Sequence, residues 1–536
     1  MLPVAEPRVV AMKLADGTRL DADIWAPAGG GRHPVLLMRQ PYGRAIASTL
    51  VFAHPAWYAA HGYVVVVQDV RGTGSSQGRF RLFADEIADG AAAAAWAADL
   101  PGGDGRLGMY GFSYQANTQY LAMAGGARPD AAAPAMAGWT MFDDWAWEGG
   151  SFRLASNLGW AAQMGWLRAM HDGDAAAAAA FQAAARALPL GGAARTRPEV
   201  MRAHAALTHY TDWLTHDRPG PYWQAMAPAS LLGAALPSVP MLHVGGWYDQ
   251  MLMGTLGAHA AFAGARDAAQ RLVVGPWQHQ PWGRRVGAVD FGPAAVSRID
   301  TAQLAWFERH LKGRDVPTGA PVSLFDLGRH VWHDFADWPQ TVETAWFLAG
   351  DGLAASGGGG ALQTGAPPAG VERFVHDPWR PAPTHGGHLG APGGMQDRAG
   401  VDDRTDVAVF TSAPLAAPLF LCGRVRAELE ASADQPSFDL NVTLSMVDPQ
   451  GRAWNLTQGQ ARRDEAGWCE VAMRATCATV PAGHCLRLSV AGACYPGHPV
   501  NPGDGSAAAD FTMARERIIT LSITTGHSRL VLPVVA

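Results

Sequence analysis

The sequence predicts an α/β protein whose parallel sheet is interrupted by a helical insertion and followed by an all-β domain. In the first third of the chain, short continuous apolar runs alternate with helical patterns. Strand patterns are missing from about 138 to 235, and short strand-like runs return after about 317. Continuous apolar runs are typical of strands buried on both faces, and their alternation with helices is typical of a parallel sheet. A chain of 536 residues is long enough for two or three packed units.

The elements of the sheet follow in chain order. Runs such as 34–38 (PVLLM) and 63–67 (YVVVV) are apolar or β-branched, whereas 84–100 is rich in Ala with Asp and Glu early. These patterns predict strands at 34–38, 63–67, 107–110, 239–244 and 271–274 and helices at 84–100 and 299–312. The α/β core is therefore assigned to 1–137 and 236–316. A helical cap at 138–235, with an Ala-rich helix at 175–188, splits it.

The last domain, 317–536, is predicted to be a jelly-roll β-sandwich, because strand-like runs such as 407–410, 439–444 and 518–523 alternate with Gly and Pro turns. All five cysteines lie in it, at Cys422, Cys469, Cys477, Cys485 and Cys494. An odd number without C-x-x-C spacing favours reduced thiols over a disulfide framework or a metal site. A single disulfide within this segment is the alternative interpretation.

Charge and hydropathy exclude several function classes. The net charge is −6 and the pI is near 6.3, without a dense Lys/Arg block, which argues against nucleic-acid binding. The first residues lack a basic segment followed by an apolar one, and no apolar run is long enough to span a bilayer. We therefore expect a cytoplasmic protein without a nucleic-acid or membrane partner.

A candidate nucleophile lies at Ser113. Residues 111–116 (GFSYQA) follow a predicted strand and precede a helical stretch, and a serine at such a tight turn requires small neighbours, here Gly111 and Ala116. Gln115 stands where the G-x-S-x-G pattern has its second Gly. Taken alone, the segment is also compatible with an ordinary strand-to-helix turn.

A nucleophilic serine needs a base that takes its proton and a carboxylate that orients the base. In this fold class the acid and then the histidine follow later in the chain, each beyond a strand end. Asp249 follows the predicted strand that ends at Val244, and His279 follows the one that ends at Val274. The order and placement predict a Ser113, Asp249 and His279 triad.

Further segments around these residues carry a family resemblance. They are 39–43 (RQPYG), 68–78 (QDVRGTGSSQG), 104–109 (DGRLGM), 246–249 (GWYD), 275–279 (GPWQH), 374–378 (FVHDP), 383–387 (PTHGG) and 411–415 (TSAPL). Together they resemble the CocE/NonD family, which groups cocaine-esterase-like hydrolases with X-prolyl dipeptidyl-peptidases and α-amino-acid ester hydrolases. The resemblance implies an α/β-hydrolase core, an inserted helical cap and a C-terminal jelly-roll domain.

The resemblance also implies roles for further residues. Tyr42 is similar in position to the tyrosine whose hydroxyl forms the oxyanion hole together with the backbone N–H after the nucleophile, here that of Tyr114. A phenol with an ordinary pKa near 10 is a donor at neutral pH. Among the cap tryptophans, Trp147 and Trp160 are the candidates for pocket walls, with Met251 as a third. Aromatic walls favour an apolar or aromatic acyl group.

Other interpretations are weighed against this one. Gly72 and Gly74 after an apolar strand hint at a dinucleotide loop, but Gln77 occupies the third glycine position. In the resembling α-amino-acid ester hydrolases, carboxylates follow the nucleophile and precede the triad acid, where this chain has Ala116 and 219–224 (PGPYWQ). Asp143, Asp144 and Glu148 in the cap are an alternative amino-group site, although a solvated helix face or helix start is the favoured interpretation.

The expected function is the cleavage of carboxylic esters through an acyl-enzyme on Ser113. The alternatives are an Xaa-Pro dipeptidyl-peptidase, an α-amino-acid ester hydrolase or β-lactam acylase, and a non-catalytic binding protein. No cofactor or metal is expected. The expected partner is a small-molecule ester or amide substrate, and a homo-oligomer stays open.

Overall fold

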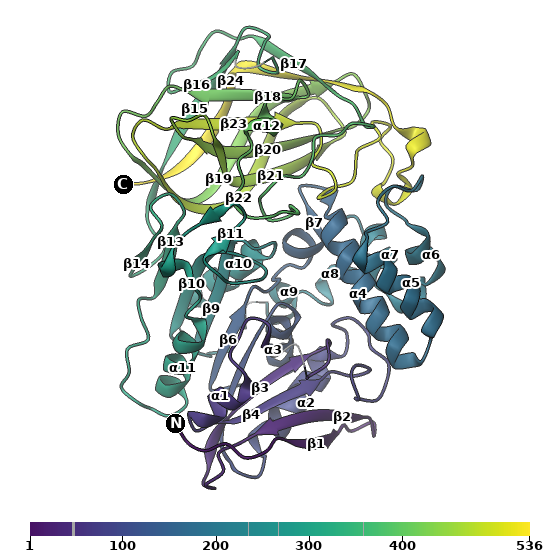
Figure 1. Cartoon of the computed structure of the whole chain (residues 1–536), viewed down its shortest axis with the longest axis vertical. Coiled ribbons are helices and arrows are strands. Elements are labelled where there is room, and N and C mark those ends of the chain that lie inside the picture. Colours follow the sequence, from purple (N-terminus) through teal and green to yellow (C-terminus); the bar gives the residue numbers. More distant parts are fainter. Residues whose placement is uncertain (46–48, 234, 266, 357–358) are drawn as a thin grey trace.

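A computed structural model describes the chain except for residues 46–48, 234, 266 and 357–358 (Figure 1). In the described residues, the apolar runs of the first third lie in a ten-stranded sheet with the order β1-β2-β4-β3-β5-β6-β9-β10-β13-β14. Pairs from β4 to β13 are parallel, and the pairs β1–β2, β2–β4 and β13–β14 at the edges are antiparallel. The strands are β1 (Arg8–Lys13), β2 (Arg19–Trp25), β3 (His33–Gln40), β4 (Val64–Asp69), β5 (Gly103–Phe112), β6 (Ala131–Ala135), β9 (Met241–Tyr248), β10 (Gln270–Gln278), β13 (Val322–Asp326) and β14 (Val331–Phe335).

Helices cover both faces of this sheet (Figure 1). They are α1 (Pro55–Ala60), α2 (Glu86–Ala98), α3 (Tyr114–Ala124), α10 (Leu252–Ala265) and α11 (Ile299–His310). Small residues let α2 and α3 approach closely, since a Cβ at Gly90 would lie 2.9 Å from the Ala122 Cβ. Glu86 and Asp89 in the first turn of α2 face the positive end of the helix dipole. The predicted α/β core is confirmed.

The helical cap is inserted between β6 and β9. Its elements are the π-helix Phe142–Ala146, the short strands β7 (Trp147–Glu148) and β8 (Ser151–Phe152), the 3₁₀ turn Ala205–Leu207, and helices α4 (Leu154–Asp172), α5 (Ala175–Arg186), α6 (Glu199–Ala203), α7 (Tyr210–Thr215), α8 (Pro221–Gln224) and α9 (Pro228–Leu232). The Asp174 side chain caps α5 by accepting from the Ala177 amide at 3.0 Å. The first amides of α4 instead donate to the Gly497 and Pro496 carbonyls of the last domain, at 2.8 and 3.1 Å.

The last domain is all-β, as expected. In its described part, β15 pairs with both β16 and β24, so that the sheet β15-β16-β18-β23-β20-β21-β22-β19-β24 closes into a barrel, with β17 beside β24. Its elements are β15 (Thr341–Gly350), β16 (Gly360–Gln363), β17 (Val371–His376), α12 (Ala399–Asp402), β18 (Val407–Ser412), β19 (Leu419–Ala433), β20 (Phe438–Val447), β21 (Ala453–Arg463), β22 (Gly467–Val480), β23 (Cys485–Ala491) and β24 (Ile519–Val535). All five cysteines are free thiols, so none of them forms the disulfide that the sequence left open.

The core sheet extends beyond the boundary predicted at 316. Strand β13 pairs in parallel with β10, with Leu272 opposite Val322, and β14 adds the last antiparallel strand. The assignment of residues 317–335 to the β domain is therefore wrong, because their strands complete the core sheet. At this edge the Asp326 carboxylate accepts from the Thr479 amide of β22 at 2.8 Å, which joins core and barrel. No helix in the described ranges is both long and apolar enough to cross a membrane.

Candidate active site

Ser113 lies at a strained turn between β5 and α3. Its φ of 61° is in the left-handed region, and its amide donates to the Ala135 carbonyl of the neighbouring strand β6 at 2.9 Å. A Cβ at Gly111 would lie 2.5 Å from the Gln115 Cβ, so the turn requires glycine at position 111. Strain of this kind persists where the surroundings over-determine the backbone, and it is typical of a serine presented as a nucleophile.

Gln115 occupies the place of the second Gly in the usual pattern. Its side chain turns back toward the strand, and its Oε1 accepts a hydrogen bond from the Phe112 amide at 3.1 Å. The residue is fully buried. The turn thus accommodates a long side chain by using its amide to satisfy a buried backbone donor.

The register of β9 and β10 brings Asp249 and His279 together. Tyr248 and Gln278, the last residues of these parallel strands, are paired, so the residues that follow leave the sheet side by side. His279 Nδ1 lies 2.8 Å from Asp249 Oδ1, and His279 Nε2 lies 3.0 Å from Ser113 Oγ. Asp249 is fully buried, whereas the His279 side chain is 23% exposed. The three residues form one hydrogen-bonded chain, in which His279 is the most exposed member and Ser113 is 5% exposed.

Tyr42 lies beside the serine. It follows β3, where its amide donates to Gln40 Oε1 at 2.8 Å, and its hydroxyl shares a hydrogen bond with Ser113. The same hydroxyl accepts from Trp160 Nε1 at 3.3 Å. Burial raises the pKa of Tyr42 to about 12, against the opposing effect of these two hydrogen bonds. The phenol is therefore protonated throughout the neutral range and retains a proton to donate.

Tyr114 enters the site through its backbone only. It begins α3, so its N–H is one of the first amides of the helix, which lack intrahelical acceptors. Its side chain points away: the hydroxyl donates to Glu86 Oε1 at 3.1 Å, and the ring stacks on Phe83 with centroids 4.5 Å apart. A free helix amide beside Ser113 is suited to an oxyanion.

A cavity of about 410 Å³ opens over the serine between core and cap. Its apolar wall includes Leu50, Phe112, Trp145, Trp160, Trp166 and Met251. Its polar lining, apart from Tyr42 and the catalytic candidates, consists of Gln115, Gln163, Gln250 and Gln280. No Asp, Glu, Lys or Arg is among the described residues that line it. The cavity therefore suits an uncharged, largely apolar group.

The structure brings Trp160 and Met251 to this cavity but not Trp147. Trp147 is 1% exposed, donates from Nε1 to the Trp213 carbonyl at 3.0 Å and stacks on Phe142. The prediction of Trp147 as a pocket wall is therefore wrong, since its ring belongs to the interior of the cap. Trp145, two residues earlier, reaches the cavity instead and packs on Trp160 with centroids 5.0 Å apart. Tryptophan content marked this region, but spacing alone did not select the right one.

Comparison with known proteins identifies the family. The family profile of X-Pro dipeptidyl-peptidase (S15 family) matches residues 16–281, and that of the X-Pro dipeptidyl-peptidase C-terminal non-catalytic domain matches residues 315–531. The cocaine esterase of Rhodococcus sp. (strain MB1 Bresler) is 32% identical over 538 aligned positions, which cover 93% of each chain. The chain belongs to the CocE/NonD family of serine hydrolases. It is thus a hydrolase that acts on ester or amide bonds.

Further relatives of this family member agree with its fold. A putative serine esterase of Mycobacterium bovis is 26% identical and covers 84% of this chain and 79% of its own length. A solved α-amino acid ester hydrolase has a TM-score of 0.83 at 21% identity and covers 99% of this chain and 97% of that one. An aminopeptidase from a marine sediment archaeon of the Thaumarchaeota has a TM-score of 0.82, also at 21% identity, and covers 100% and 97%. At this identity the structural likeness establishes the fold alone.

The cap acids that were an alternative amino-group site of this hydrolase are engaged elsewhere. Asp144 accepts hydrogen bonds from the amides of Trp139, Thr140 and Met141 at 2.7–2.8 Å, so its carboxylate caps the start of the π-helix, in line with the favoured interpretation of a helix start. Glu148 is buried against His388, which contradicts the expectation of a solvated position. Neither residue lines the cavity over Ser113.

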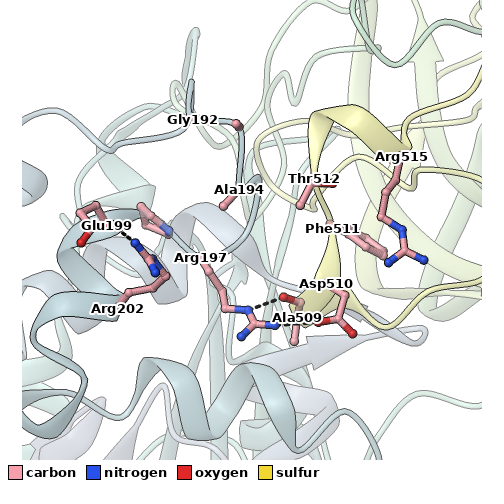
Figure 2. Close-up of a pocket in the computed structure, with 12 residues that line it drawn as sticks. Gly192, Ala194, Arg197, Glu199, Arg202, Ala509, Asp510, Phe511, Thr512 and Arg515 are labelled. Atoms are coloured by element: carbon pink, nitrogen blue, oxygen red, sulfur yellow. Dashed lines mark hydrogen bonds and ion pairs between the residues drawn. The ribbon is translucent and has the colours of Figure 1, made fainter.

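A larger cavity, of about 680 Å³, lies between the cap and a loop of the barrel domain (Figure 2). Its arginines are paired with acids: Arg197 with Asp510, Arg202 with Glu199, and Arg515 with Asp504. Its described lining contains neither Ser113 nor its two partners. The cavity with the reactive constellation is therefore the smaller one over the serine.

Proposed function

We propose that this hydrolase cleaves carboxylic esters with an uncharged, apolar or aromatic acyl group through an acyl-enzyme on Ser113. The observation that carries the proposal is the cavity over Ser113, with its tryptophan wall and uncharged lining. An ammonium group buried there without a carboxylate partner would lose its hydration uncompensated. This argument favours simple acyl esters over substrates with a free α-amino group.

The geometry supports each step of acyl transfer. Ser113 Oγ attacks the carbonyl carbon while His279 Nε2, 3.0 Å away, takes its proton and later delivers it to the leaving group. The Asp249 carboxylate accepts from His279 Nδ1 at 2.8 Å and holds the ring in the required tautomer. The Tyr42 hydroxyl and the Tyr114 amide donate to the oxyanion of the tetrahedral intermediate. Water then attacks the acyl-enzyme with His279 again as base.

A matched pair of substrates tests the acyl preference. The p-nitrophenyl esters of 3-phenylpropanoic acid and of phenylalanine differ only in the α-amino group. At pH 6.5 that group is largely charged, and we expect kcat/KM for the amino ester to be at least about tenfold lower. The α-amino-acid ester hydrolase alternative requires the opposite order, and the Xaa-Pro dipeptidyl-peptidase alternative requires release of p-nitroaniline from an unblocked Xaa-Pro anilide.

The role of Ser113 is tested on the same esters. Ser113→Ala should lower kcat by about 10⁴- to 10⁶-fold while the thermal transition stays close to that of the wild type. A fluorophosphonate should label the wild-type protein at Ser113, located by peptide mass mapping, and leave Ser113→Ala unlabelled. Full activity of the variant, or an adduct on another residue, would exclude Ser113 as the nucleophile.

A further inference from the structure

Hydrogen bonds from the cap and from the barrel converge on the turn that carries Asp249. The Asp249 carbonyl accepts from Arg474 Nη2, in β22 of the barrel, at 2.6 Å. The next carbonyl, of Gln250, accepts from Arg153 Nη1, at the start of α4 in the cap, at 2.9 Å. Two consecutive carbonyls beside the triad are thus held by guanidinium groups from two other parts of the molecule.

Arg474 also brings a charge to this turn. The residue is 4% exposed, and its Nε and Nη1 lack a hydrogen-bond partner among the described residues, as does the buried Asp249 Oδ2. Burial, with the neighbouring Arg153, lowers the pKa of Arg474 to about 10, while Glu148 and Asp249 oppose this shift. The guanidinium therefore remains charged at neutral pH and influences the fully buried Asp249 carboxylate electrostatically.

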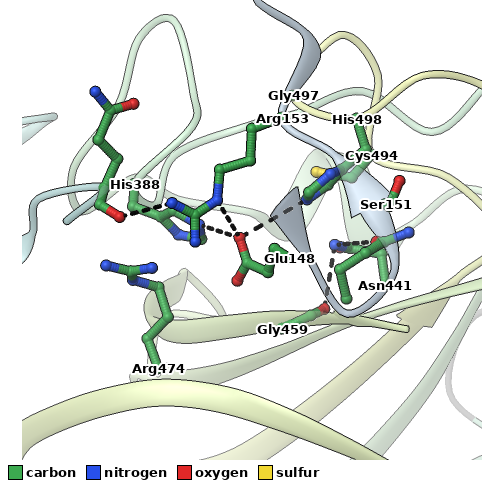
Figure 3. A network of polar contacts seen from close by, with 12 residues as sticks. Glu148, Ser151, Arg153, His388, Asn441, Gly459, Arg474, Cys494, Gly497 and His498 are labelled. Atoms are coloured by element: carbon green, nitrogen blue, oxygen red, sulfur yellow. Dashed lines mark hydrogen bonds and ion pairs between the residues drawn. The ribbon is translucent and has the colours of Figure 1, made fainter. Parts of the chain in front are cut away.

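Glu148 balances the two arginines (Figure 3). Its Oε2 lies 3.3 Å from Arg153 Nε and 2.8 Å from His388 Nε2. Burial alone would raise the pKa of Glu148, but His388 and Arg153 hold it well below its usual range. The two buried guanidinium groups of Arg153 and Arg474 thus lie among buried carboxylates, since Asp144, Asp249 and Glu148 all favour the charged form of Arg474.

We propose that Arg474 is a positioning residue of the active site, through which the barrel domain fixes the backbone and the charge environment of Asp249. The inference rests on the proposed role of Asp249 as the acid of the triad. It assigns the C-terminal domain a part in catalysis, because the guanidinium reaches Asp249 only when β22 is docked on the core.

The reason lies in how precisely a triad must be placed. Asp249 orients His279 through a single hydrogen bond, so a shift of the Asp249 turn is transmitted to His279 Nε2 and to Ser113 Oγ. Displacements of about 1 Å cost on the order of 10²-fold in rate. The substrate cavity does not include Arg474 among its described lining residues, so its loss is expected to affect kcat more than KM.

Arg474→Met tests the proposal in the full-length protein, with the p-nitrophenyl ester of 3-phenylpropanoic acid as substrate. We expect kcat to fall by about 10- to 100-fold and KM to change by less than about threefold. We also expect the acidic limb of the kcat/KM profile to move to higher pH. With one positive charge fewer, the pair of Asp249 and His279 holds its proton to a higher pH.

Arg398→Met is the matched control. Arg398 is a buried arginine of the same domain, but its side chain contacts Asp402 and the His385 carbonyl rather than the Asp249 turn. It should destabilise the barrel while leaving kcat and the acidic limb as in the wild type. If both variants lower kcat equally, or if Arg474→Met raises KM at unchanged kcat, Arg474 is not a positioning residue.

Arg474→Lys keeps the positive charge on a shorter side chain. It tests the role of Arg474 if Arg474→Met does not fold. We expect a kcat between those of the wild type and Arg474→Met, with the acidic limb in its wild-type place. A kcat equal to that of the wild type would overturn the proposal. Fluorophosphonate labelling separates this proposal from the proposed function. If wild-type Ser113 is not labelled, the proposed function fails. If wild-type Ser113 is labelled and Arg474→Met is labelled at the same rate, only the role of Arg474 is refuted.

Discussion

At the scale of single residues, the surroundings of Tyr42 determine what its hydroxyl does. Burial raises its pKa to about 12, and Trp160 donates to the oxygen at 3.3 Å, which leaves the phenolic proton free for another acceptor. In the resting site the hydroxyl also shares a hydrogen bond with Ser113. When Ser113 attacks, the developing oxyanion is a strong acceptor for the phenolic proton.

Tyr42→Phe should lower kcat by about 10²- to 10³-fold, because it removes one oxyanion donor, and should leave KM within about threefold. Steady-state kinetics on the simple aryl ester measures both. Tyr210→Phe is the control, since it removes another buried hydroxyl, which donates to the Thr196 carbonyl inside the cap. Equal kcat values for Tyr42→Phe and the wild type would show that the Tyr42 hydroxyl does not stabilise the oxyanion together with the Tyr114 amide.

At the scale of elements, strand β5 and helix α3 position the nucleophile. The chain passes from a buried strand into a helix within one residue, Ser113, whose positive φ turns the backbone sharply. Gly111 has a φ of 145° and faces the first turn of the helix, where Gln115 fills the space. The turn at Ser113 therefore leaves no space for a Cβ at position 111, where the sequence has glycine.

Gly111→Ala should therefore lower both stability and activity, because its Cβ would lie 2.5 Å from that of Gln115. Gly105→Ala is a matched control on the same strand: Gly105 also has a positive φ, of 91°, but a Cβ there meets nothing within 4 Å. We expect a cost of about 1–2 kcal/mol for Gly105→Ala from backbone strain alone, and a larger one for Gly111→Ala. Urea unfolding and kcat measure both. Equal costs would show that the turn tolerates a side chain at 111.

At the scale of the whole molecule, cap, core and barrel are joined by buried polar contacts. The Tyr248 hydroxyl of the core donates to the Asn455 carbonyl of the barrel at 2.8 Å. Cap and core each also bury a histidine: burial lowers the pKa of His209 in the cap and of His243 in the core to about 3. These rings remain neutral in the folded protein at pH values where the unfolded chain protonates them.

Stability should consequently fall as the pH is lowered through about 6.5, and should keep falling until the folded-state values near 3 are reached. The unfolded state binds the extra protons, so acid favours it. Each such histidine contributes a loss of about 2 kcal/mol between pH 7 and pH 5. His209→Phe should show a correspondingly smaller loss in urea unfolding. His527→Phe, at an exposed position, is the control and should unfold as the wild type does. An unchanged pH dependence in His209→Phe would contradict the prediction.

Much of the core was predictable because its signals are local. Strands buried on both faces have continuous apolar runs, and Asp249 and His279 each follow the end of one of them. The strands extend a few residues beyond their apolar runs, to Tyr248 and Gln278. Asp249 and His279 are therefore the first residues after their strands. The boundary at 316 was misplaced because β13 and β14 resemble the strands of the next domain in composition, and only their pairing with β10 assigns them to the core.

The sequence by itself determined the class of the fold, the three-part organisation and the chain order of Ser113, Asp249 and His279, because these depend on periodicity and turn chemistry along the chain. Only the tertiary structure decided that Trp145 rather than Trp147 faces the cavity and that Glu148 is buried. It alone placed Arg474 on the Asp249 carbonyl, 225 residues away in the chain. Such contacts depend on how separate elements pack, and no local pattern records which side chain reaches across an interface.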